Sequence, residues 1–197
     1  MLLSIDPSTT TVGAALFVPF DRRLFAATSL PLEVVIDEDP LVRWLRIAEL
    51  ARTWAVDELF HTGGGVTNFV FERPQFYSAV KSKGDPNKLV GVLGVGAALA
   101  GMFYSNGVRL LKSYLPAEWI GQLSKVCPTC RGKAKRKCKD CHGSAWETPR
   151  GRRIASRLSP EERAKCPDQN DAIDAVGIGL KHLGRLEPVR VYSNGRD

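Results

Sequence analysis

One stretch near the N-terminus decides the fold: Leu3-Ser-Ile-Asp-Pro-Ser-Thr-Thr-Thr-Val-Gly13. The apolar run that contains Ile5 ends at Asp6-Pro7, and because proline cannot continue a central strand, we expect the first strand to stop there. A polar turn then leads into a second apolar run, 12–18. A connection this short predicts two antiparallel strands, with Asp6 at the carboxyl end of the first.

The other elements follow from hydrophobic periodicity and from turn and capping signals. We expect three more strands, at 24–36 (interrupted near Pro31), 66–71 and 108–111. Helices are predicted from Asp39, over 88–105 and 117–123, from Ser159, and over 169–183. Three meandering strands followed by strands that alternate with helices indicate an α/β protein, with a mixed five-stranded sheet and helices on both faces.

Four carboxylates fall where this arrangement would bring them together. Asp6 ends the first predicted strand and Glu72 ends the fourth, so parallel neighbours would place both at one edge of the sheet. Asp171 and Asp174 lie three residues apart on the last helix and share a face. Such carboxylates repel one another unless a hard cation such as Mg²⁺ intervenes. Each acid taken singly is also typical of a solvated surface position.

Four of the five cysteines form two C-x-x-C pairs within fifteen residues. Cys127-Pro-Thr-Cys130-Arg-Gly and Cys138-Lys-Asp-Cys141-His-Gly predict two knuckles that wrap one structural Zn²⁺ with four thiolates. We expect one zinc per chain and a reducing, cytoplasmic environment, because no secretion signal suggests disulfides. The alternative is a loop without metal, and Cys166 lies too far away to join the cluster.

Basic charge is concentrated around these cysteines. The formal net charge is +7, yet 125–157 alone holds eleven Lys/Arg and two acids, so the rest of the chain is net negative. A segment this one-sided suggests a polyanionic partner, although a solvated basic loop is the alternative. We predict an inserted basic zinc module at 125–157, a nuclease core at 1–124 and 158–187, and a tail at 188–197.

Three of these motifs together resemble the RuvC family of Holliday junction resolvases, which have the RNase H-like fold. The N-terminal stretch resembles the family's opening Ile-Asp-Pro-Gly, Phe69-Val-Phe-Glu72 its second catalytic strand, and Asn170-Asp-Ala-Ile-Asp-Ala175 its closing helix. The resemblance implies an endonuclease that resolves four-way DNA junctions by paired nicks. It also implies two Mg²⁺ or Mn²⁺ ions, a homodimer, and a catalytic, metal-binding set: Asp6, Glu72, Asp171 and Asp174.

The chain departs from the family pattern in the parts that would contact DNA. Ser8 replaces the family's glycine, Gln75 replaces its stacking aromatic, and the cysteine segment, which is similar to a shortened zinc centre of DnaJ chaperones, replaces a basic loop. These departures resemble the phage-encoded branch of the family. We expect the DNA contacts to come from two aromatic and six basic residues: Phe76, Tyr77, Lys81, Lys83, Lys133, Lys135, Arg136 and Lys137.

The same sequence features also suit two other functions. A fork or flap nuclease would use the same carboxylates, whereas a non-catalytic, zinc-containing DNA-binding protein would not need them. An actin-like kinase needs two such domains, so we expect no nucleotide cofactor.

The charge-free stretch 89–108 is rich in glycine, so we expect a buried helix and no membrane span. The helix 88–105 is also the predicted dimer interface, because its small residues allow close approach; packing within its own core is the alternative.

Overall fold

A five-stranded mixed sheet forms the centre of the computed structural model, which describes residues 1–33, 35–73, 86–120, 123, 127–131 and 138–186. The strands are β1 (Leu2–Pro7), β2 (Thr11–Val18), β3 (Arg23–Pro31), β4 (Asn68–Glu72) and β5 (Arg109–Tyr114). Their order is β3-β2-β1-β4-β5. β1 pairs antiparallel with β2 and parallel with β4, which confirms the neighbours predicted for the first strand.

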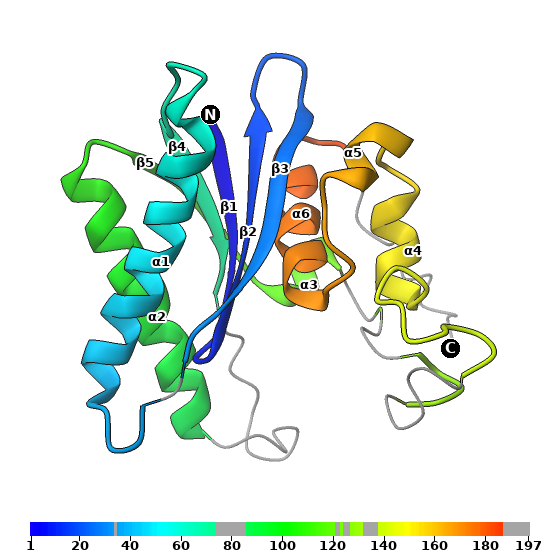
Figure 1. The fold of residues 1–197 in the computed structure, drawn as a ribbon, viewed down its shortest axis with the longest axis horizontal. Helices are drawn as coiled ribbons and strands as arrows, with labels where there is room; N and C mark the ends of the chain where they lie inside the picture. Colours follow the sequence, from blue (N-terminus) through cyan, green and yellow to red (C-terminus); the bar gives the residue numbers. More distant parts are fainter. Residues whose placement is uncertain (34, 74–85, 121–122, 124–126, 132–137, 187–197) are drawn as a thin grey trace, which may run out of the picture.

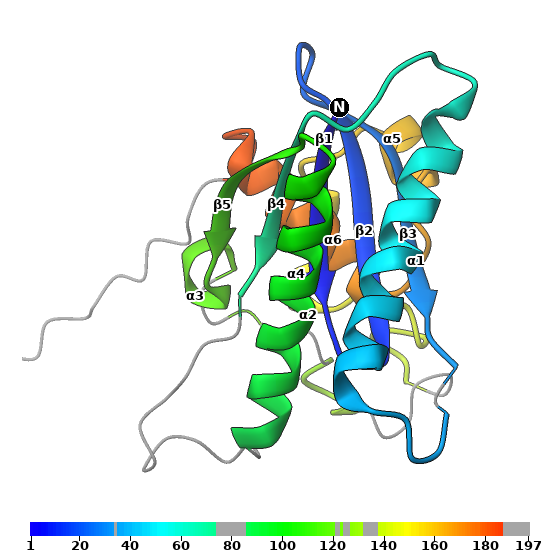
Figure 2. The same ribbon diagram turned by 90° about the vertical axis from the view of Figure 1, so that its left-hand side faces the viewer.

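Helices cover both faces of the sheet, as predicted (Figure 1). α1 (Pro40–Phe60) and α2 (Pro86–Ser105) lie side by side on one face (Figure 2). The opposite face carries α6 (Asn170–His182), with α3 (Pro116–Trp119), α4 (Pro149–Ala155) and α5 (Pro160–Ala164) around it. Within the described part of the chain, no helix is long and apolar enough to cross a membrane.

Several predicted boundaries were wrong for local reasons. β3 ends at Pro31 and does not continue to residue 36, because proline lacks the N–H that a longer strand would need. The helix expected over 117–123 is a single turn, Pro116–Trp119, while β5 continues to Tyr114. α4 was not predicted at all. Its start is marked by Thr148-Pro149, in which the Thr148 side chain accepts a hydrogen bond from the N–H of Gly151.

The glycines of α2 face inward. A Cβ at Gly94 would lie 2.3 Å from the Trp44 ring of α1, and one at Gly96 would lie 2.9 Å from the Phe71 ring. These glycines let α2 pack closely against its own core, so they are not available to a second copy. Gly101 is the exception, because it is exposed and a Cβ there would meet nothing within 4 Å.

The part of the chain that follows the cysteines packs into the core. Trp146 and Ile154 belong to the same buried cluster as α6, although both lie within the predicted insertion 125–157. The division into core, insertion and tail stays a prediction. What the packing establishes is that the segment leaving the cysteine knuckles is fixed against the helix that carries Asp171 and Asp174.

Candidate active site and metal centre

Two acidic side chains end neighbouring parallel strands at the same level. Ile5 of β1 is paired with Phe71 of β4, so Asp6 and Glu72 are the next residues along both strands. Ile5 and Phe71 pack beneath α1 and α2. Because successive side chains of a strand alternate between faces, Asp6 and Glu72 point to the opposite face, toward α6. Asp6 is 9% exposed.

α6 is held over these two strands by close backbone contacts. The Ser4 hydroxyl donates a 2.7 Å hydrogen bond to the carbonyl of Ala175. Gly13, which is paired with Asp6 across β1 and β2, touches the backbone of Asp171 so closely that a Cβ would lie 1.9 Å from its carbonyl oxygen. The first turns of α6, with Asp171 and Asp174, therefore lie above the strand ends that carry the other two acids.

Gly13 is expected to be essential for this docking. Replacing it with alanine should lower the free energy of unfolding by about 3 kcal/mol, because the added methyl group forces α6 away from β2. Urea unfolding measures the change. Gly65→Ala is the control, since a Cβ there meets nothing within 4 Å; it should change stability by less than about 0.5 kcal/mol. Equal stability of both variants would contradict this account of the contact.

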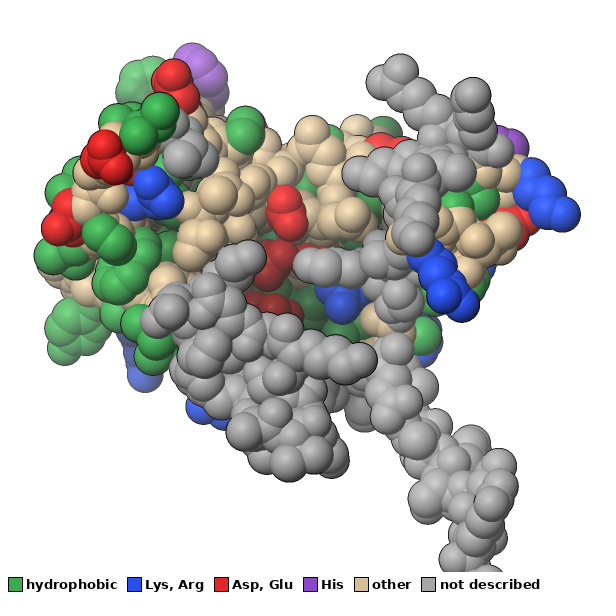
Figure 3. All heavy atoms as spheres, turned by 90° about the horizontal axis from the view of Figure 1, so that it is seen from below, with side chains coloured by type: hydrophobic (Ala, Val, Ile, Leu, Met, Phe, Trp, Pro, Cys, Tyr) green, Lys and Arg blue, Asp and Glu red, His purple; other side chains and the backbone are tan. Residues whose placement is uncertain are grey.

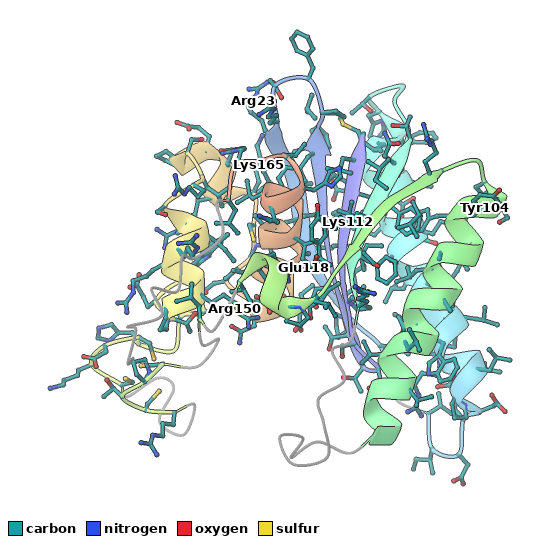
Figure 4. The ribbon with its side chains drawn as sticks, turned by 180° about the vertical axis from the view of Figure 1, so that it is seen from behind. Arg23, Tyr104, Lys112, Glu118, Arg150 and Lys165 are labelled. Carbon is teal, nitrogen blue, oxygen red and sulfur yellow. The ribbon has the colours of Figure 1, made fainter. Side chains whose placement is uncertain are left out.

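A buried arginine reaches the same site. Arg150, near the start of α4, donates a 2.6 Å hydrogen bond from Nη1 to Oδ2 of Asp174, and the two side chains are 14% and 3% exposed. Its guanidinium also lies 5.4 Å from the ring of Trp119. The Trp119 indole in turn donates a 2.7 Å hydrogen bond to Glu72. Figure 4 shows Arg150 at the lower end of α6, between α4 and α3.

The donor set suits a hard divalent cation, because carboxylate oxygens are the ligands that Mg²⁺ and Mn²⁺ prefer. Figure 3, which looks onto this end of the sheet, shows acidic side chains gathered in a hollow beside Lys or Arg. The four carboxylates do not close around one point, however. Among the described residues, the cysteines are the only group of three or more potential ligands whose atoms all lie within 4.8 Å of one another.

The four cysteines have the geometry of a tetrahedral metal site. Their sulfurs are 3.8 Å apart between Cys127 and Cys138, and 3.7 Å apart between Cys130 and Cys141. A tetrahedral zinc with bonds of about 2.3 Å requires sulfurs about 3.8 Å apart. The two knuckles also have the same backbone hydrogen bond. The N–H of Arg131 donates to the carbonyl of Cys127 in the first knuckle, and the N–H of His142 donates to the carbonyl of Cys138 in the second.

The pKa values of two of the four clustered thiols are shifted in opposite directions. Backbone N–H groups, that of Cys130 first, lower the pKa of the Cys127 thiol to about 7 and favour its thiolate. The N–H of Gly143 acts in the same way on Cys141, but burial and the neighbouring sulfurs raise the pKa of that thiol to about 12. Thiolates this close repel one another, and a divalent ion among them removes the conflict.

A cleft of about 610 Å³ connects the two sites. The cysteine cluster forms one wall, and polar residues at the ends of β2, β3 and α6, including Asp171, form the other. Asp168 fixes the spacing, because its Oδ1 accepts hydrogen bonds from the N–H groups of Ala145 (2.7 Å) and Trp146 (3.2 Å). Ala145 and Trp146, which follow the second knuckle, are thereby hydrogen-bonded to Asp168 just before the start of α6.

The residues proposed to contact DNA all lie outside the described residues. They are Phe76, Tyr77, Lys81, Lys83, Lys133, Lys135, Arg136 and Lys137. Sequence reasoning did not find Arg150 or Asp168, which link the cysteine segment to α6. The capping pair Thr148-Pro149 could have revealed a helix next to Arg150, but the sequence has no signal that turns this arginine inward.

The mixed sheet, with helices on both faces and the final helix over β1 and β2, gives the chain an RNase H-like α/β fold. Two solved structures of Thermus thermophilus RuvC share this fold. One, in complex with Holliday junction substrate, aligns with a TM-score of 0.51 and 16% identity over 95% of this chain and 98% of RuvC. The other aligns with a TM-score of 0.52 and 17% identity over 95% and 99%.

A third solved structure, the yeast mitochondrial Holliday junction resolvase, aligns with a TM-score of 0.48 and 14% identity over 93% of this chain and 78% of its own. No protein-family profile and no curated protein sequence matches the chain. The chain therefore has the RuvC fold that its sequence predicted, at a sequence identity of only 16% and 17% to the two RuvC structures.

Proposed function

We propose that this protein is a divalent-metal-dependent endonuclease that cuts four-way DNA junctions by paired nicks. One observation carries the proposal: in a RuvC fold, Asp6 and Glu72 end adjacent parallel strands at one level, directly beneath the first turns of α6. Convergent carboxylates at this position serve a hard metal ion. The junction as substrate is suggested by the Thermus RuvC complex, which contains one.

In this proposal Asp6, Glu72, Asp171 and Asp174 hold two Mg²⁺ or Mn²⁺ ions. Such a pair of ions activates water and stabilises the leaving oxygen in phosphodiester hydrolysis. The chain's own residues set the geometry. The β1–β4 register aligns Asp6 with Glu72, and the Trp119 indole orients the Glu72 carboxylate through its hydrogen bond. The burial of Asp6 and Asp174 excludes bulk water, which strengthens every charge interaction in the site.

The cysteine cluster supports this function in a structural role. Four protein thiolates around one Zn²⁺ leave no open coordination position, so the ion folds the knuckles and takes no part in the chemistry. The basic residues that the sequence places between the knuckles, within 132–137, would contact the DNA backbone and position the protein without reading sequence. Phage origin and a cytoplasmic location belong to the same proposal.

The direct test is to incubate the protein with Mg²⁺ and a labelled four-way junction, beside plain duplex, a fork and a flap, and to map the cuts. The proposal predicts symmetric nicks in two strands of the junction and little cutting of duplex. Equal cutting of forks and flaps would widen the substrate class. Binding without any cut, in Mg²⁺ and in Mn²⁺, would favour a non-catalytic DNA-binding protein.

Paired nicks require two active sites, so we also propose a two-fold symmetric homodimer. The exposed side of α2 is the proposed interface, because it carries an uncharged stripe at helical spacing: Val90, Leu93, Ala97, Gly101 and Tyr104. The small residues Ala97 and Gly101 would let two helices approach closely.

Leu93→Glu is expected to convert the dimer to a monomer, because a charge would be buried at the centre of the stripe. Light scattering at matched concentrations measures the mass. Phe20→Glu is the control, since Phe20 is 98% exposed on the β2–β3 turn, away from α2. A wild-type protein that stays monomeric both free and on a junction would refute the dimer, and an unaffected Leu93→Glu dimer would refute this interface.

A further inference from the structure

A positive charge lies buried among the carboxylates of the proposed catalytic site. Arg150 is bonded to Asp174 and lies over Trp119, which is itself bonded to Glu72. One guanidinium is thus bonded directly to one of the four acids and lies over the indole that is hydrogen-bonded to a second. Buried ion pairs contribute little net stability after desolvation, so this pair is poorly explained by stability alone.

The position of Arg150 is fixed by the backbone around it. Thr148 caps the start of α4, and Gly151 approaches the chain at Ala145 so closely that a Cβ would lie 2.1 Å from its carbonyl oxygen. Ile154 then packs against Gly177 of α6. The α4 backbone is therefore locked against α6, while the long Arg150 side chain keeps rotatable bonds with which to move between partners.

The bonding of Arg150 is also incomplete. Within the described residues its Nε is buried and has no hydrogen-bond partner. A guanidinium has five N–H donors in a planar fork that matches a carboxylate or a phosphate with two parallel bonds. Buried donors without partners are rare, and an unused edge of an arginine beside a hydrolytic site points to an anionic ligand that is still to bind.

We propose that Arg150 is a displaceable counter-ion: it neutralises Asp174 until a divalent cation takes that carboxylate, and its guanidinium then binds the phosphate that is cut. This inference rests on the proposed function. Two cations that share one carboxylate compete, so the presence of either weakens the binding of the other. Once displaced, the guanidinium stabilises the negative charge that develops on the phosphate, where a planar fork serves better than an ammonium group.

The first test measures metal binding without DNA. Mn²⁺ is titrated into the wild type, Arg150→Gln and Arg152→Gln, and free Mn²⁺ is followed by electron paramagnetic resonance. Removing the competing charge should tighten Mn²⁺ binding about tenfold in Arg150→Gln, within the usual range of such coupling. Arg152→Gln should bind as the wild type does, because Arg152 is exposed and lies on the same helix. A purely structural role would leave Mn²⁺ affinity unchanged in both variants.

The second test separates binding of the junction from its cleavage. At saturating Mn²⁺, the single-turnover cleavage rate of Arg150→Gln should fall about 100-fold, as for loss of one preorganised donor. Junction affinity in Ca²⁺ should change little, and Arg150→Lys should recover only part of the rate. Unchanged Mn²⁺ affinity, or wild-type cleavage by Arg150→Gln, would overturn the role of Arg150. Failure of the wild type to bind Mn²⁺ or to cut junctions would instead remove the proposed function and, with it, this inference.

Discussion

Asp6→Asn is expected to abolish junction cleavage, lowering the single-turnover rate by roughly 1,000-fold or more, the upper end for loss of one electrostatic stabiliser. The substitution keeps the shape of the side chain but removes the charge that would hold the metal. Glu72→Gln and Asp174→Asn should have effects of the same order. Junction affinity should remain near that of the wild type, because in the proposed site these acids would hold metal and would not contact the DNA backbone.

Cleavage should need Mg²⁺ or Mn²⁺ and fail in Ca²⁺, whose looser coordination aligns water poorly. Gel shifts in Ca²⁺ measure binding, and single-turnover kinetics in Mg²⁺ measure cutting. Asp57→Asn is the matched control, since Asp57 is exposed on α1, away from the acids. Full activity of Asp6→Asn would refute the assignment of the site.

Loss of zinc is expected to have the second large effect. Replacing Cys127 and Cys138 with serine should release the ion, because two of four thiolate ligands are gone, and should unfold the knuckles, which owe their folding to the metal. Unfolding of the knuckles should also disturb the carboxylate site. Trp146 is bonded to Asp168, and α4, which carries Arg150, follows directly after it. We therefore expect cleavage to fall about 100-fold, as for removal of Arg150 itself.

Zinc release is measured with a chromogenic chelator, and the sheet and helices are followed by circular dichroism. The double variant should lose zinc but keep most of its far-ultraviolet signal, because β1 to β5 and α6 are buried in two hydrophobic clusters that are separate from the cysteine cluster. Cys166→Ala is the control, since Cys166 is buried outside the cluster and burial raises the pKa of its thiol to about 12. A zinc-free variant that cuts junctions at the wild-type rate would show that the module and the acids act independently.

The fold was predictable because its signals are local. An apolar run that ends in Asp6-Pro7, a second that ends in Glu72, and an Asp-x-x-Asp pair near the start of the last helix are each contained within a few residues. Placing the first two on neighbouring parallel strands required only the expected sheet order, which the structure confirms. The site formed by the four cysteines was equally predictable, because the C-x-x-C spacing by itself specifies a metal-binding knuckle.

The role of Arg150 was not predictable, because composition pointed the other way. Arg150, Arg152 and Arg153 lie in a strongly basic segment, which suggested contacts with a polyanion. In the structure Arg152 is exposed, whereas Arg150 turns inward to Asp174, 24 residues further along the chain. The glycines of α2 show a similar limit. Small residues permit close packing but do not say whether the neighbour is Trp44 of the same chain or a second copy.

The contact between Ser4 and Ala175 joins residues 171 positions apart. Contacts this distant in sequence form late, because the chain must close a long loop before they contribute any stability. During synthesis, β1 and β2 emerge first and must wait for nearly the whole chain before α6 can cover them. A growing or truncated chain that stops before residue 170 has Asp6 and Glu72 but neither acid of α6. If these acids cut DNA, the cell that makes the protein is exposed to that activity only after synthesis has passed α6.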